Sequence, residues 1–134
     1  MSSGSSSSFA KMQGDILYYI NEHRLSKGLI PLNMNQVLTA EAQKHSQQMA
    51  SGRVAFGHSG FSNRVERIST QLGPISQSGE NVASGNLSAQ QVVANWLSST
   101  GHRENIEGKF TLTGIGIAKN NKGVIYFTQI FIRK

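Results

Sequence analysis

Histidine and glutamate are the side chains of this sequence that could most readily do chemistry. The chain has four histidines and no cysteine, so metal binding or proton transfer falls to imidazoles and carboxylates. His58 and His102 lie in glycine-flanked, turn-forming segments, and Glu80 follows Gly79. Two imidazoles and one carboxylate are the protein ligands of many open zinc sites. The three residues are far apart in sequence, so only the fold can bring them together.

Each of these residues also has an ordinary structural interpretation. Histidines beside glycine are usually loop residues, and Glu80 could simply bond backbone amides and hold the end of a strand. His45 lies on the apolar face of a predicted helix, where we expect a packed, hydrogen-bonded histidine. Other chemistries lack their motifs, since the sequence has no GxSxG, no HExxH and no phosphate-binding glycine loop, and Asp15 is its only aspartate.

The charge of the chain bears on its partners. The net charge is +6, from 13 Lys and Arg against 7 acidic residues. These basic residues are scattered, and the densest group is Arg64 with Arg67, whereas nucleic-acid binding needs a cluster. We therefore expect a basic surface and no nucleic-acid partner. We also expect no transmembrane segment, because no run of about eighteen apolar residues occurs.

The first eight residues differ from the rest of the chain. Residues 1–8 form a Ser/Gly-rich tract with neither a basic segment nor an apolar core, so they are not a signal peptide. We expect this tract to be flexible. It is either vector-derived sequence or the tether of a lipoprotein whose signal and lipidated cysteine have been removed. Residues 9–134 have the size of one domain.

Apolar residues at three- and four-residue steps predict helices. Ser88 opens the last of them, because its hydroxyl and the Gln91 side chain can form a capping box. A loop is expected at Gln71–Ser78, which is rich in Gly, Pro, Ser and Gln. The other predicted helices are Phe9–Ser26, Gln36–Ser51 and a short Phe61–Ile68.

Three strands are predicted, at Glu80–Ala83, Leu112–Ala118 and Val124–Ile132. The turn-forming residues Asn120–Gly123 join the last two into an antiparallel hairpin. The final strand is apolar on both faces, which suits a central strand covered on both sides. The predicted fold is α+β, a three-layer α-β-α sandwich with a small antiparallel sheet.

Three motifs in this order resemble the CAP superfamily (cysteine-rich secretory protein, antigen 5 and PR-1; the SCP domain). They are Gly-Glu-Asn-Val-Ala at 79–83, Trp96 followed by Gly-His-Arg-Glu-Asn-Ile at 101–106, and Thr-Gly-Ile-Gly-Ile-Ala at 113–118 with the strand 126–131. The resemblance covers about 9–132 and implies an α-β-α sandwich with a large cleft. Since extracellular domains of this size often carry disulfides, the lack of cysteine fits the bacterial type.

The resemblance also implies that two histidines and two acidic residues face the cleft. Carried over by motif, the histidines are His58 and His102, and the first acid is Glu80. The position of the second acid is Ser99 here, so one carboxylate is missing unless Glu104 or a water replaces it. His58, His102 and Glu80 are then the candidate ligands of Zn²⁺, the one cofactor that we expect.

Two functions remain open. The first is a non-enzymatic module, secreted or displayed on the cell surface, that binds an extracellular or host partner, a lipid or a metal. The alternative is a metal-assisted, protease-like hydrolase that uses the same cleft. The resemblance and the lost acid at Ser99 favour the first, because acid–base catalysis gains from paired groups. Segment Ser69–Ser78 is polar apart from Leu72 and Ile75, which predicts weak lipid or sterol binding at best.

Overall fold

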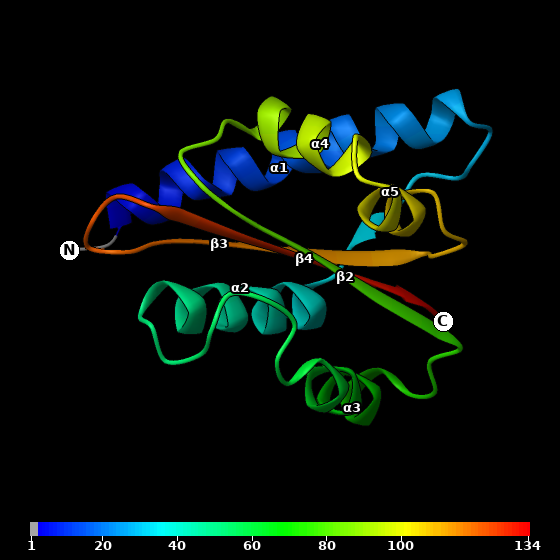
Figure 1. Cartoon of the computed structure of the whole chain (residues 1–134). Helices are drawn as coiled ribbons and strands as arrows, with labels where there is room; N and C mark the ends of the chain where they lie inside the picture. Colours follow the sequence, from blue (N-terminus) through cyan, green and yellow to red (C-terminus); the bar gives the residue numbers. More distant parts are fainter. Residues whose placement is uncertain (1–2) are drawn as a thin grey trace.

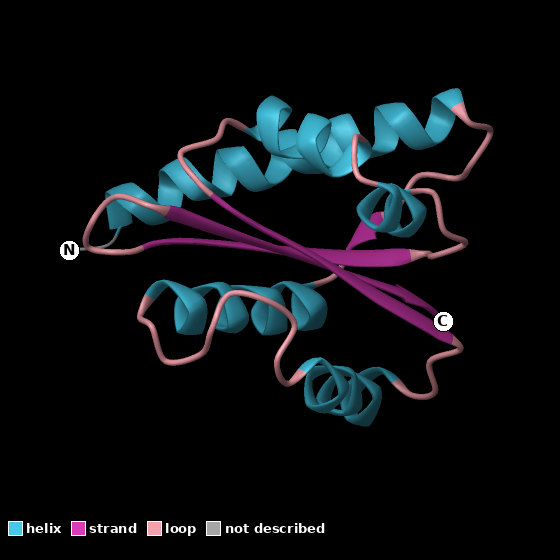
Figure 2. Cartoon of the chain, viewed as in Figure 1, coloured by secondary structure: helices cyan, strands magenta, loops and turns pink. Residues whose placement is uncertain are grey.

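A mixed sheet lies between two layers of helices (Figures 1 and 2). The structure, a computed structural model, describes residues 3–134, with side chains from Phe9 onward. Helices α1, α4 and α5 cover one face of the sheet, and α2 and α3 cover the other. The elements are α1 (Ser3–Ser26), β1 (Asn33–Met34), α2 (Gln36–Ala50), α3 (Phe61–Leu72), β2 (Gln77–Ser84), α4 (Ala89–Leu97), α5 (Thr100–Ile106), β3 (Leu112–Lys119) and β4 (Ile125–Arg133).

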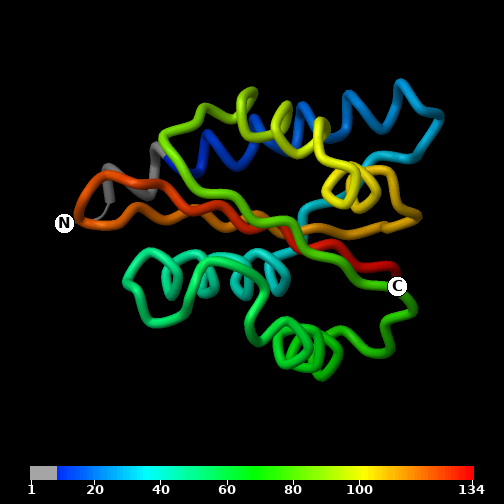
Figure 3. The backbone as a smooth tube through the Cα atoms, viewed as in Figure 1, coloured from blue at the N-terminus to red at the C-terminus, as the bar shows by residue number. Residues whose placement is uncertain are grey.

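The strand order is β1-β3-β4-β2. Strand β4 pairs antiparallel with both β3 and β2, so it runs through the middle of the sheet (Figure 3). The predicted hairpin and the α+β, three-layer fold are confirmed. The sheet is not purely antiparallel, however, because β1 pairs parallel with β3 at its outer edge. Two residues are too few to give a periodic pattern, so the sequence pattern does not reveal β1.

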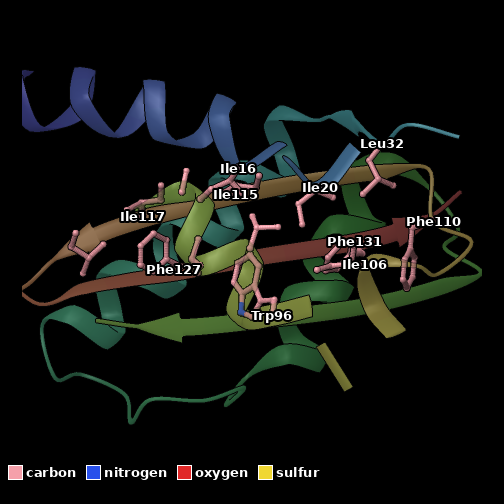
Figure 4. Close-up of a cluster of buried hydrophobic side chains, with 14 residues drawn as sticks. Ile16, Ile20, Leu32, Trp96, Ile106, Phe110, Ile115, Ile117, Phe127 and Phe131 are labelled. Carbon is pink, nitrogen blue, oxygen red and sulfur yellow. The ribbon is translucent and has the colours of Figure 1, made fainter. Parts of the chain in front are cut away.

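The two faces of β4 divide the core as its alternating side chains predict. Phe127 and Phe131 pack towards α1 and α4 around Trp96 (Figure 4). Ile130 and Ile132 pack on the opposite face, with residues of α2 and α3. All of these side chains are almost completely buried, so β4 forms part of two hydrophobic clusters.

Local sequence signals explain where several helices begin. The predicted capping box is present, since the Ser88 hydroxyl accepts from Gln91 N–H and the Gln91 side chain accepts from Ser88 N–H. Asn35 caps α2, because its side chain accepts from the backbone N–H groups of Val37 and Leu38.

Helix α1 begins six residues before the predicted Phe9, because extending an existing helix costs far less than starting one. Residues 1–2 of the predicted flexible tract 1–8 lie outside the described residues, and the others belong to α1. The flexibility of the tract stays a prediction.

Helix α2 lies unusually close to β3, at two glycines. A Cβ on Gly114 would overlap the backbone of Leu38, and one on Gly116 would overlap the backbone of Ala42 and Gln43. The close approach lets Ser46 donate a hydrogen bond of 3.0 Å to the carbonyl of Gly116. The glycines at alternate positions of β3 therefore set the distance between the sheet and the layer of α2 and α3.

Replacing Gly116 with alanine should destabilise the fold, because backbone cannot move aside as a side chain can. We expect a loss of at least about 1–3 kcal/mol in the free energy of unfolding, measured by urea denaturation. Gly14→Ala is the matched control, since Gly14 is an exposed residue of α1 and a Cβ there would meet no other atom within 4 Å. It should stabilise the chain by about 0.5–1 kcal/mol. Equal stability of the two variants would contradict the close packing.

Candidate functional site

The loop before α3 holds His58 against the carboxylate of Glu80 on β2. His58 Nδ1 lies 2.8 Å from Glu80 Oε1. A carboxylate only accepts, so Nδ1 must carry the proton, and Nε2 is left with its lone pair. The His58 side chain is 51% exposed and that of Glu80 only 1%. A buried carboxylate thus orients an accessible imidazole.

Glu80 owes its burial to an arginine that the motifs of the sequence do not single out. Arg64 Nε donates to Glu80 Oε2 and Arg64 Nη2 donates to Oε1, both at 2.8 Å. The Arg64 side chain is only 4% exposed, and it also donates to the carbonyl of Ser59 at 2.7 Å. Arg64 therefore joins β2, α3 and the loop that carries His58.

A signal for Arg64 is nevertheless present in the sequence. Arg64 lies four residues before the buried Ile68, on the inward face of α3. An arginine on the apolar face of a helix indicates buried acceptors for its guanidinium, either a carboxylate or several backbone carbonyls, because a buried charge needs hydrogen-bonding partners. The interpretation that groups Arg64 with Arg67 on a basic surface is wrong for Arg64. Glu80 does not hold backbone amides, as its structural interpretation proposed, but the guanidinium of Arg64 and the ring of His58.

His45, on α2, supports the loop that carries His58. It is fully buried, and its Nε2 lies 2.7 Å from the carbonyl of Gly57, to which it must donate. The interpretation of His45 as a packed, hydrogen-bonded histidine is thus confirmed. Burial lowers the pKa of His45, an effect that the hydrogen bond to Gly57 opposes and the charge of Arg64 reinforces. A neutral ring beneath the site thereby fixes the residue before His58.

His102 reaches the same region from the other helical layer. Its Nδ1 lies 2.9 Å from the hydroxyl of Ser99, the residue at the position where the resemblance implies a second acid. Burial, and then the charge of His58, lower the pKa of His102. The charge of His58 therefore reaches His102, although the two rings belong to different helical layers. A hydroxyl can donate or accept, so Ser99 does not fix the tautomer of His102 as Glu80 fixes that of His58.

The residues beside Glu80 attach α5 to β2. Asn81 Nδ2 donates to the carbonyl of His102 at 3.1 Å, and Asn105 Nδ2 donates to Asn81 Oδ1 at 2.8 Å. Asn105 also lies so close to Gly79 that a Cβ there would come within 2.8 Å of its side-chain oxygen. The Gly-Glu-Asn motif therefore needs its glycine for close packing and its asparagine to position the segment that carries His102.

The candidate metal ligands do not all play the same part. Both oxygens of Glu80 are bonded to Arg64, so its carboxylate fits the role of a partner to His58 and not that of a direct ligand. Among residues 9–134, no three His, Asp or Glu side chains form a group that could hold a metal ion. His58 and His102 each keep one ring nitrogen free of the bonds described above. Glu104, the suggested replacement acid, is exposed on α5.

The two histidines differ in exposure, since the side chain of His58 is half exposed and His102 is partly buried. Several hollows of about 270–590 Å³ in the described part of the chain are lined by residues other than these two. The large cleft that the resemblance implies is therefore not one of these hollows. A ligand of this site would meet the half-exposed ring of His58 and the partly buried ring of His102.

Comparison with known proteins identifies the family. The family model of the cysteine-rich secretory proteins (CAP) matches residues 17–131, so the chain belongs to that family. It is 29% identical over 131 residues to the uncharacterized protein YkwD of Bacillus subtilis, covering 96% of this chain and 49% of that protein. The chain thus spans about half the length of that relative.

Solved structures agree. An extracellular protein containing an SCP domain from Bacillus anthracis matches with a TM-score of 0.77 and 27% identity, over 93% of this chain and 41% of that one. An outer surface protein of Borrelia burgdorferi matches with a TM-score of 0.74 and 21% identity, over 89% and 90% of the two chains. The neighbours thus include extracellular and outer-surface proteins. In residues 3–134, no helix is both long and apolar enough to cross a membrane.

Removing one partner of the buried ion pair should be costly. Arg64→Met leaves the carboxylate of Glu80 buried without its guanidinium, and we expect a loss of about 3–5 kcal/mol in the free energy of unfolding. The double variant Arg64→Met with Glu80→Gln should be more stable than Arg64→Met alone. Arg67→Met is the control, because Arg67 lies on the same helix as Arg64, is 46% exposed and pairs with Glu41 of α2. Its replacement should cost below about 1 kcal/mol. Equal losses for Arg64 and Arg67 would refute this role of Arg64.

The chain should lose stability as the pH falls below about 6.5. The pKa values of His45 and His102 are lowered by folding, so the unfolded chain takes up protons first and acid favours it. The loss should begin near the ordinary histidine pKa and level off below the lowered values. Thermal unfolding across this range should show a shallower pH dependence in His45→Gln and in His102→Gln. An unchanged slope in both variants would show that neither histidine is responsible.

Proposed function

We propose that this CAP domain is a non-enzymatic binding module, displayed outside the cell, in which the imidazoles of His58 and His102 hold a divalent cation such as Zn²⁺. The observation that carries the proposal is the hydrogen bond from His58 Nδ1 to the buried Glu80. It leaves Nε2, a preferred zinc donor, unprotonated and on the exposed side chain. The extracellular and outer-surface neighbours support display outside the cell.

His58 and His102 would be the two protein ligands. Glu80 would act behind His58, where a carboxylate fixes the ring tautomer and raises the basicity of the ligand nitrogen. The lowered pKa of His102 keeps its ring neutral near pH 7, which metal binding requires. When bound, the cation would offer its remaining coordination positions to donor atoms of a partner.

The arrangement favours binding over metal-assisted hydrolysis. A hydrolase needs a group that is free to take a proton from water. Glu80 is already engaged by Arg64 and His58, and the position of the second acid holds the Ser99 hydroxyl, which is a poor base near neutral pH. The alternative of a protease-like hydrolase therefore has less support from the described contacts.

Lipid or sterol binding should be weak. Helix α3 extends to Leu72, beyond the predicted end at Ile68, and β2 begins at Gln77, before the predicted Glu80. The predicted loop Gln71–Ser78 is therefore shorter at both ends. Leu72 and Ile75 pack against the cluster beneath the sheet. The large apolar side chains of this segment are therefore used in the fold. Anchoring of the domain through a lipidated N-terminal segment stays a prediction.

Zinc titration tests the proposal. Isothermal calorimetry should show Zn²⁺ binding to the wild type, and His102→Ala should weaken it at least about tenfold. Ser99→Glu should strengthen it by about 10–100-fold, because a carboxylate beside His102 Nδ1 would fix its tautomer and add charge. Binding should also disappear as the pH falls and the rings become protonated.

The control for this titration is His23→Ala. His23 pairs with Glu107 at 2.7 Å, on α1 and away from the loop of His58, so this variant should bind like the wild type. Equal affinity in wild type, His102→Ala and Ser99→Glu would disprove the proposed site, because the metal would then be bound elsewhere.

A further inference from the structure

The outer edge of β3 is only partly covered by β1. Strand β1 pairs with Leu112 and Thr113 alone. The chain then turns into α2, and the last contact is a hydrogen bond of 2.9 Å from Asn35 N–H to the carbonyl of Thr113. In residues 3–134, no strand pairs with this edge of β3 beyond Thr113, whereas β4 pairs with the opposite edge as far as Lys119. This edge runs between the two helical layers, with α1 on one side and α2 on the other (Figure 1).

Two glutamine side chains take the place of a neighbouring strand there. Gln13 Nε2, from α1, donates to the carbonyl of Ile115 at 2.6 Å. The amide of Gln43, from α2, donates to the carbonyl of Ile117 at 2.8 Å and accepts from its N–H at 2.9 Å. Opposed residues of an antiparallel pair exchange the same two bonds. The edge is therefore already bound by groups with the chemistry of a peptide.

Hollows lie on both sides of Gln43 along this edge. The first, of about 590 Å³, has an uncharged lining of Gln13, Met34, Gln36, Thr39, Ala40 and Gln43. The second, of about 330 Å³, is lined by Gln47, Ala50, Ser51, Ala118, Lys119, Asn120 and Asn121. Both are bordered by the same face of α2, which presents its residues at three- and four-residue steps.

The charges and polar groups of this groove indicate what it would take. Lys119 is exposed and forms no ion pair with residues 9–134, and the chain as a whole carries a net charge of +6. Thr39 Oγ1 is buried without a partner among the described side chains. An occupant with hydrogen-bonding backbone, an apolar residue for the first hollow and an acid near Lys119 would satisfy all of these groups.

We propose that the free edge of β3 binds an acidic, extended peptide segment of a partner protein as an added antiparallel strand. Main-chain bonds to Ile115 and Ile117 would give affinity, and the two hollows would select side chains. Because β3 ends at Lys119, the amino-terminal end of an antiparallel peptide would lie there and carry the acid. Gln13 and Gln43 would swing away when the peptide binds, and at other times they protect the edge. This proposal is independent of the histidine site.

A synthetic peptide provides the test. The probe is acetyl-Asp-Val-Thr-Val-Thr-Val-amide, added to ¹⁵N-labelled protein and followed by NMR. The backbone amides of Ile115 and Ile117 and the side-chain amides of Gln13 and Gln43 should shift in one saturable process. The same peptide N-methylated on the amides that face β3 should lose binding, because its side chains are kept and only the main-chain donors are removed.

Variants of the groove sharpen the test. Gln43→Ala removes the competing amide and should bind the peptide roughly tenfold more tightly, since two hydrogen bonds no longer have to be broken. Gln71→Ala, at an exposed residue of α3 that lines neither hollow, should bind like the wild type. Lys119→Ala should weaken binding of the acidic peptide, and a peptide with its aspartate at the carboxyl end should bind less well.

Three results would overturn the proposal. The first is the absence of shifts at the β3 edge in the wild type. The second is equal binding of the N-methylated peptide, which needs no variant to be folded. The third is self-association of Gln43→Ala through the same amides with no response to the peptide, since this would assign the edge to a second copy of the chain.

Discussion

The buried ion pair between Arg64 and Glu80 is the interaction on which the arrangement of the site depends. Taking both charges out of water is expensive, and the cost is offset only when every polar atom finds a partner. Here the carboxylate accepts from Arg64 twice and from His58 once, at 2.8 Å each. These bonds can form in only one relative position of β2, α3 and the intervening loop. The pair therefore specifies geometry, whatever its net contribution to stability.

The alternation of side chains along β2 explains how two helical layers meet at one place. Glu80 points to the layer of α2 and α3, where it meets Arg64, and its neighbour Asn81 points to the other layer, where it meets α5. β2 is the outermost strand of the sheet on its side. His58 comes from the layer of α2 and α3, and His102 comes from the layer of α1, α4 and α5. The two residues can thus approach each other around the edge of the sheet.

Much of this fold could be predicted from the sequence, because its signals are local. The two apolar faces of β4, the capping box at Ser88 and the turn at Asn120–Gly123 each depend on neighbouring residues. The missed features depend on contacts between distant ones. Strand β1 exists only because β3 lies beside it, and the short helix α5 is held by Asn81.

The site shows the same division. Motif resemblance placed His58, Glu80, Ser99 and His102, but spacing alone could not show that Glu80 is bonded to a guanidinium sixteen residues away. That partner changes the role of Glu80 from ligand to positioning residue. It also explains why His58, although exposed, has a defined orientation.

The most direct test of this account is the tautomer of His58. Long-range ¹H–¹⁵N NMR at about pH 8, where an ordinary imidazole is neutral, distinguishes the protonated ring nitrogen from the unprotonated one. The account predicts a proton on Nδ1 and a free lone pair on Nε2, because Glu80 can only accept. A His58 ring protonated on Nε2 would contradict it, since Nδ1 would then have no proton to donate to Glu80.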